Sequence, residues 1–148
     1  MKKIALFSAF GFFAISAYAQ EIKSTEVPPA IQASFTKLHP NAKVDKWEKE
    51  GTHYEAEFMD NKVETSVEFG PNGQLMATEV AINVSDLPKA ASDYCTKNIA
   101  GKKISEAAKI TEANGKVSYE AEVDGTDYFF DTNGNFVSKE TEKHGDKK

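Results

Sequence analysis

The tetrapeptide Tyr54-Glu55-Ala56-Glu57 decides the fold, because the chain repeats it as Tyr119-Glu120-Ala121-Glu122. Each copy alternates an apolar or aromatic residue with a carboxylate, and a glycine turn precedes each copy. Alternation with a period of two residues is typical of a strand that has one buried face. The duplication therefore predicts two similar segments in the chain, with a period of about sixty residues.

Each predicted segment begins with a helix. Val27-Pro28-Pro29-Ala30-Ile31 opens the first, since proline is tolerated in the first turn of a helix. Leu87-Pro88 opens the second in the same way. Apolar residues then recur at helical spacing and predict one core-facing stripe in each helix. The stripes consist of Val27, Ile31, Phe35 and Leu38, and of Tyr94, Cys95 and Ile99.

Alternating stretches follow each helix and predict antiparallel strands joined by turns that contain Asn, Asp or Gly. In the strand near residues 43–48 the apolar parity shifts between Val44 and Trp47, which predicts a bulge or a late start of the strand. The predicted fold class is α+β, with two tandem repeats at 27–82 and 83–140. Each repeat is expected to hold one helix followed by a four-stranded antiparallel meander sheet.

The first nineteen residues are typical of a secretory signal peptide. Met1-Lys2-Lys3 is basic, Ile4 to Ile15 is apolar, and Ala17-Tyr18-Ala19 is a small-residue cleavage signal before Gln20. The apolar run is shorter than the ~20 residues that a membrane span needs, which disfavours the alternative of a retained anchor. We therefore expect cleavage at about Ala19-Gln20 and a mature protein in the periplasm or the medium.

Cleavage would leave 129 of the 148 residues and, with two lysines lost, change the formal net charge from −5 to −7. An acidic chain without an arginine-rich patch is not expected to bind nucleic acid or anionic membranes. Cys95 is the only cysteine, so an intramolecular disulfide is excluded, and its place on the helical stripe favours a core residue over a reactive thiol. Residues 20–26 are a polar lead, and the charged tail 141–148 is predicted to be disordered.

Patterns that predict catalysis or metal binding are missing from the sequence. The chain has no G-x-S-x-G motif, and its histidines, His39, His53 and His144, form no H-x-x-x-H pair. Asp131-Thr132-Asn133-Gly134 lacks the rest of a calcium loop, so a turn is favoured over a calcium site. We therefore predict a protein that is not an enzyme and has no metal or cofactor.

The carboxylate pairs Glu55/Glu57 and Glu120/Glu122 allow three interpretations. The favoured one is the solvated face of a one-sided antiparallel sheet. The others are an acidic binding surface and a general acid–base pair, since alternation places each pair on one face some 6 to 7 Å apart. Trp47 allows two interpretations, of which a core residue is favoured over an exposed binding anchor.

The order of a Leu/Val-Pro helix, a Tyr-Glu-Ala-Glu strand and a Phe-x-x-Asn-Gly hairpin occurs twice, the hairpins spanning 69–73 and 130–134. With this repeated order of motifs, the chain resembles the PepSY-like, beta-lactamase-inhibitor-protein-like family of secreted Bacteroidetes proteins. The resemblance covers nearly the whole mature chain. The resemblance implies a tandem fold of one helix and four strands, and a non-catalytic binding or inhibitory role. It brings no catalytic residues. The carboxylates on the strands depart from the aromatic anchors expected of an inhibitory surface.

We predict a secreted, non-catalytic binding module that meets a basic envelope protein or peptide through its sheet surface. The alternative is an envelope protein that binds a small ligand or cation between the two repeats. An enzyme is the third choice. The candidate binding residues are Glu55, Glu57, Glu64, Glu68, Glu120, Glu122 and Trp47.

Overall fold

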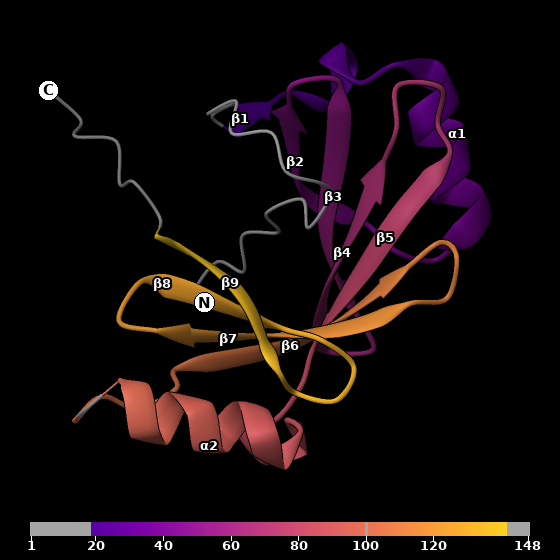
Figure 1. The fold of residues 1–148 in the computed structure, drawn as a ribbon. Helices are drawn as coiled ribbons and strands as arrows, with labels where there is room; N and C mark the ends of the chain where they lie inside the picture. The colour runs from indigo at the N-terminus through magenta and orange to yellow at the C-terminus, as the bar shows by residue number, and fades with distance from the viewer. Residues whose placement is uncertain (1–18, 100, 142–148) are drawn as a thin grey trace, which may run out of the picture. The chain divides into compact units, whose positions relative to one another are not determined.

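The computed structural model describes residues 19–99 and 101–141, which form nine strands and two α-helices (Figure 1). The helices are α1 (Pro29–Leu38) and α2 (Lys89–Asn98), and a short 3₁₀ helix precedes each, η1 (Ser24–Glu26) and η2 (Val84–Asp86). The strands are β1 (Gln20–Ile22), β2 (Val44–Glu50), β3 (His53–Asp60), β4 (Val63–Phe69), β5 (Leu75–Ala81), β6 (Glu106–Glu112), β7 (Val117–Val123), β8 (Thr126–Phe130) and β9 (Phe136–Thr141). The predicted signal peptide, apart from Ala19, and the tail after Thr141 lie outside the described residues.

The predicted fold class, an α+β fold of two repeats with separate four-stranded sheets, is wrong. The strands form one nine-stranded antiparallel sheet in chain order, from β1 to β9, and only two α-helices accompany it in the described residues. Sequence alternation identifies strands but not which strand edges pair, because edge pairing depends on tertiary structure. The polar lead also adds a strand, since Gln20–Ile22 pairs with β2.

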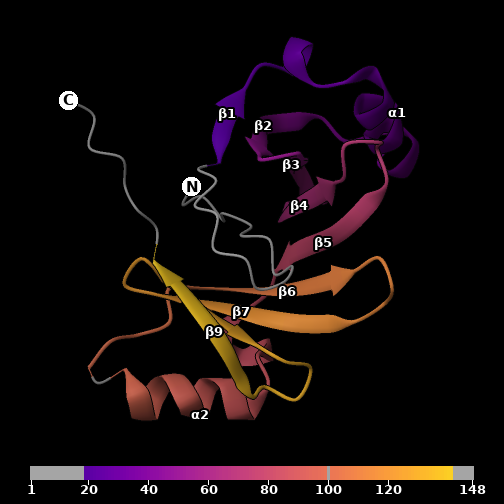
Figure 2. The same ribbon diagram turned by 45° about the horizontal axis from the view of Figure 1, so that its top comes forward.

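The chain divides into two compact units, with the boundary between Glu79 and Val80. In the first unit, β2, β3 and β4 pair antiparallel, side by side in Figures 1 and 2. Of the two predicted alternatives, a bulge and a late strand start, the structure shows the irregular register, because the β2–β3 pairing shifts between Val44 and Lys46 and β2 already begins at Val44. The core joins α1 to one face of this sheet through Ile31 and Phe35.

Proline starts both helices as the sequence predicts. Pro28 occupies the N-cap of α1 and Pro88 that of α2, and the carbonyl of each accepts bonds from the first free amides of its helix. Each helix has two buried side chains four residues apart, which in α1 are Ile31 and Phe35. One helix face is therefore buried against the sheet, as amphipathic spacing requires.

In the second unit, β6 to β9 pair antiparallel in chain order, and α2 packs on one face through Ala91 and Cys95. Cys95 is 4% exposed, so the core interpretation is confirmed. Phe130, fully buried, lies edge-on to Tyr94 with ring centroids 5.7 Å apart. Neither α-helix of the described chain is long and apolar enough to cross a membrane.

The hairpin turns follow their sequence signals. Asn61 and Lys62 both have positive φ in the β3–β4 turn, and Asp124 and Gly125 do so in the β7–β8 turn. Two successive residues with positive φ define the type I′ turn, whose twist matches that of paired strands. At Asp131, the carboxylate accepts bonds from the amides of Asn133 and Asn135, at 2.8 and 2.9 Å, as in an Asx turn.

Candidate binding surface

Carboxylates line up across the first unit on the sheet face opposite α1. The strand registers pair Glu21 with Glu48, Glu48 with Glu55, and Glu55 with Glu68. We call these four residues carboxylate row 1. Directly opposite residues of antiparallel strands have Cβ atoms about 5 Å apart, and like charges at this distance destabilise the pair. Row 1 is therefore an unfavourable arrangement for the sheet alone.

A second row crosses the second unit. Glu106 pairs with Glu122, Glu122 with Asp127, and Asp127 with Glu140, which together form carboxylate row 2. Asp127 is 4% exposed, whereas the Glu140 side chain on β9 keeps much of its contact with solvent. Partial desolvation of the Glu140 carboxyl raises its pKa. Four carboxylates thus stand in register in each unit.

Basic groups partly balance row 1. Lys46 Nζ lies 2.9 Å from Glu48 Oε1 and 2.6 Å from Glu57 Oε1. Burial alone would lower the pKa of Lys46, but the bonds to Glu57 and Glu48 outweigh it and raise the pKa. His53 Nδ1 lies 2.7 Å from Glu68 Oε1. Two carboxylates of row 1 therefore have basic partners.

Glu55 lies at the centre of row 1, and the surroundings of its carboxyl group differ from those of Glu48 and Glu68. It is 8% exposed, and its Oε1 atom has no hydrogen-bond partner among the described residues. Burial raises the pKa of Glu55 well above its usual value, although a hydrogen bond with Ser66 acts to lower it. The charges of Glu57 and Glu48 raise the pKa further, and the charge of Lys46 opposes them. Glu55 is a buried carboxyl group with an unused acceptor atom.

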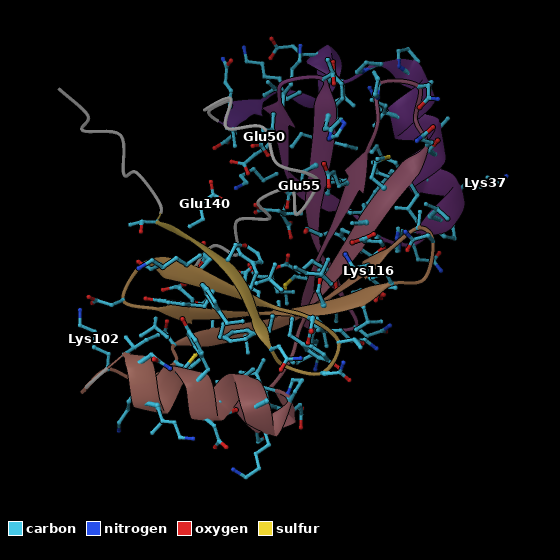
Figure 3. All side chains as sticks on the ribbon, viewed as in Figure 1. Lys37, Glu50, Glu55, Lys102, Lys116 and Glu140 are labelled. Atoms are coloured by element: carbon cyan, nitrogen blue, oxygen red, sulfur yellow. The ribbon has the colours of Figure 1, made fainter. Side chains whose placement is uncertain are left out.

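A small hollow opens at this carboxyl group. It has about 10 Å³ of free space, and we call it the Glu55 hollow. Glu50 and Glu55, labelled in Figure 3, both line it. The full lining consists of Ala19, Glu48, Glu50, His53, Tyr54, Glu55 and Glu68. A space of this size admits a single water-sized group.

The predicted site residues fall into three groups. Glu55, Glu57, Glu64 and Glu68 lie on the sheet face of the first unit that is opposite α1, where alternation places them. Glu120 and Glu122 lie on β7 in the second unit. Trp47 is 6% exposed and packs edge-on to Phe35 at 5.9 Å, so the core interpretation is confirmed and Trp47 is not a surface anchor.

The favoured prediction of a solvated carboxylate face is wrong. Glu55, Glu68 and Glu120 are buried, with 8%, 5% and 5% exposure, while Glu57 and Glu122 are half-buried. Alternation assigns these residues to one face but does not determine how much solvent reaches it.

Sequence reasoning also missed part of the surface. It did not single out Glu21, Glu48, Glu106, Asp127 or Glu140, because their alignment appears only when strand registers are known. The turn signals fix those registers, so pairing the strands across each predicted hairpin would have found most of row 1 and row 2.

The remaining candidate side chains were the histidines and the possible metal ligands. His39 packs against the rings of Phe35 and Phe58, at 5.4 and 4.6 Å between centroids. Within residues 19–99 and 101–141, no three His, Cys, Asp or Glu side chains are placed to hold a metal ion. His144 lies outside the described residues.

The substitution Glu55→Gln is expected to stabilise the protein at pH 7 by about 1 kcal/mol, the upper cost of like charges directly opposite each other. Because the folded state raises the pKa of Glu55 above the unfolded value, its penalty grows as the pH rises from 4.5 towards the folded pKa. Below pH 4.5 the carboxyl is protonated in both states and the gain should vanish. Urea denaturation of the variant and the wild type across this pH range measures the difference in their free energies of unfolding.

The matched control is Asp45→Asn, which removes an exposed carboxylate from the neighbouring strand β2. It should change the free energy of unfolding by less than about 0.5 kcal/mol. A Glu55→Gln gain that stayed constant from acid to neutral pH would show that the charge of Glu55 is not its source.

Fold and site together define a class of protein: a small sheet protein with one helix on each unit and in-register carboxylates on the strands. The family described as "Putative beta-lactamase-inhibitor-like, PepSY-like" matches residues 13–64 and 52–138. The chain therefore belongs to this PepSY-like family, which confirms the resemblance found in the sequence.

Solved structures share the fold. A "putative periplasmic" protein from Bacteroides eggerthii has 16% identity and a TM-score of 0.66, with 77% of this chain and 88% of that chain covered. A DUF2874 family protein from Bacteroides uniformis has 20% identity, a TM-score of 0.64, and coverage of 76% and 88%. A BLIP-like protein from Bacteroides fragilis has 23% identity, a TM-score of 0.58, and coverage of 82% and 90%. The comparison with curated proteins gives no match.

Proposed function

We propose that this chain is a secreted, non-catalytic binding module that recognises a basic protein or peptide of the cell envelope. The observation that carries the proposal is the in-register alignment of four carboxylates in each unit. Like charges placed directly opposite each other lower the stability of a sheet. Local arrangements that oppose stability are expected where a protein binds something.

Location supports the same proposal. The leader has the features of a signal peptide, and a structure with the same fold is described as "putative periplasmic". The family description contains the words beta-lactamase-inhibitor-like, and an inhibitor of an enzyme acts by binding a protein, which supports the proposal. We therefore propose that the mature chain acts in the periplasm or the medium, after cleavage at about Ala19-Gln20.

The proposed mechanism is electrostatic. The exposed Glu21 and the half-buried Glu48, Glu57 and Glu64 of this face attract basic side chains and speed their encounter with the protein. Exposed charge pairs are screened by salt over about 8 Å at physiological ionic strength. Binding through this face should accordingly weaken as salt is added.

The test is a titration of the mature protein with an oligolysine peptide at low and high salt. Wild type should bind, and affinity should fall by about tenfold or more with added salt, which corresponds to about 1.4 kcal/mol. The half-buried positions give the variant Glu57→Lys, Glu122→Lys, which should weaken binding by a similar factor.

The control variant Asp45→Lys, Asp86→Lys makes the same change in net charge at two exposed positions outside both rows, one on β2 and one in η2. Like the test variant, it places one substitution in each unit. It should keep most of the wild-type affinity. Binding that is insensitive to salt, or equally weakened by both double variants, would contradict the proposed surface.

A further inference from the structure

We propose that the Glu55 hollow is a binding site for one primary ammonium group. The inference rests on the proposed function and adds the chemical group that the acidic face selects. Two sources of this group are compatible with the structure: a lysine side chain of the basic partner, and the α-ammonium that signal cleavage would create on Gln20.

Charge balance in row 1 identifies Glu55 as the group that needs a cation. Its neighbours on the two adjacent strands are both acidic, Glu48 and Glu68. Glu48 is bonded to Lys46 and Glu68 to His53, at 2.9 and 2.7 Å. Glu55 Oε1 is the buried oxygen of this hollow for which the described residues supply no hydrogen-bond donor. A buried carboxylate oxygen without a donor has lost its hydration and gained no bond in return.

The dimensions of the hollow favour an ammonium over a guanidinium. Its free space, about 10 Å³, admits one water-sized group. An alkylammonium is a compact charge with three donors, whereas the guanidinium of arginine is a planar fork with five donors. Four carboxylates, from Glu48, Glu50, Glu55 and Glu68, line the hollow and supply acceptor oxygens for the three donors of an ammonium.

The first source lies in the chain itself. Ala19 lines the hollow, and β1 pairs Gln20 with Lys49, between Glu48 and Glu50. Cleavage after Ala19 would remove one wall of the hollow and turn the amide nitrogen of Gln20 into an ammonium at the same place. The second source, a partner's lysine, would enter where the hollow opens to solvent.

The experiment uses n-butylammonium, a mimic of the lysine side chain, and n-butylguanidinium as probes. Binding is followed through the NMR shifts of the Glu48, Glu55 and Glu68 carboxyl carbons. One sample is the mature chain with a free Gln20 amine, and the other is the same chain acetylated at Gln20. We expect the acetylated chain to bind butylammonium at least about tenfold more tightly than butylguanidinium.

The comparison of the two samples separates the sources. If the Gln20 ammonium fills the hollow, the free chain should bind butylammonium about tenfold more weakly than the acetylated chain, because the two ammonium groups compete. If a partner's lysine is the natural occupant, both samples should bind the probe alike. Either result supports an ammonium site.

Glu55→Gln in the acetylated chain should weaken butylammonium binding by about tenfold or more. The matched control is Glu120→Gln, at the same place in the second Tyr-Glu-Ala-Glu copy, where the paired residues are Ala108 and Phe129 instead of carboxylates. It should leave probe binding unchanged. The chemical shifts of the remaining residues report whether each variant is folded.

The inference is overturned if the acetylated chain binds no butylammonium, binds butylguanidinium equally well, or is unaffected by Glu55→Gln. Oligolysine binding that persists in any of these cases would leave the proposed function intact. Conversely, probe binding without salt-dependent oligolysine binding would reject the proposed function and keep the ammonium site.

Discussion

Phe58→Ala is expected to lower the free energy of unfolding by about 3 to 5 kcal/mol, the range typical of a buried phenylalanine. The Phe58 ring is 1% exposed and lies edge-on to Phe35 with centroids 5.1 Å apart. It also contacts the His39 ring at 4.6 Å. Removing the ring would leave a cavity between β3 and α1 that the surrounding side chains fill only in part.

Urea denaturation followed by circular dichroism measures the loss. The matched control is Phe136→Ala, the same substitution at a ring that is 38% exposed and stacked on Tyr94 at 4.6 Å. Loss of that stack should cost about 1 kcal/mol. Equal losses in the two variants would mean that Phe58 does not anchor the first core.

Gly134→Ala is expected to cost about 2 to 4 kcal/mol, from two separate causes. Gly134 has φ of +84°, which is unfavourable for a residue with a side chain. A Cβ atom at this position would also lie 2.8 Å from Pro88 Cβ and 2.9 Å from the Ala91 amide nitrogen. The β8–β9 turn packs directly against the start of α2 and leaves no room for a methyl group.

Gly115→Ala separates the two causes. Gly115 has nearly the same φ, +87°, but a Cβ atom there would meet nothing within 4 Å. Only the conformational cost should remain, about 1 kcal/mol. Thermal or urea unfolding of both variants gives the difference. If Gly115→Ala lowered the free energy of unfolding as much as Gly134→Ala, the close contact with α2 would not contribute to the loss.

Local features of the fold were predictable from the sequence. Proline at the helix starts, the core stripe of Ile31 and Phe35, and the bulge after Val44 all depend on residues close together in the chain. Helical spacing and turn residues carry this information directly. The core position of Cys95 follows from the same spacing.

The joining of all nine strands into one sheet was not predictable in this way. Two copies of a strand motif favour two separate sheets, whereas the observed sheet depends on which edges meet. β1 was also missed, because Gln20–Ile22 is too short and polar to show an alternating pattern. Its pairing with β2 is a tertiary contact.

The candidate site was half predictable. Alternation placed Glu55, Glu57, Glu64 and Glu68 on one face, and the structure agrees. Burial of Glu55 was not predictable, because carboxylates are seldom buried without a charged partner. A sequence rule that reflects common behaviour will miss a residue that departs from it.

The two hydrophobic cores differ in one further respect. Trp47, the only tryptophan, lies in the core of the first unit, and Cys95, the only cysteine, lies in the core of the second. Indole fluorescence therefore reports on one unit, and the rate at which a thiol reagent modifies the cysteine reports on the other. Each unit of the natural chain carries its own single-copy probe of unfolding, and no added label is needed.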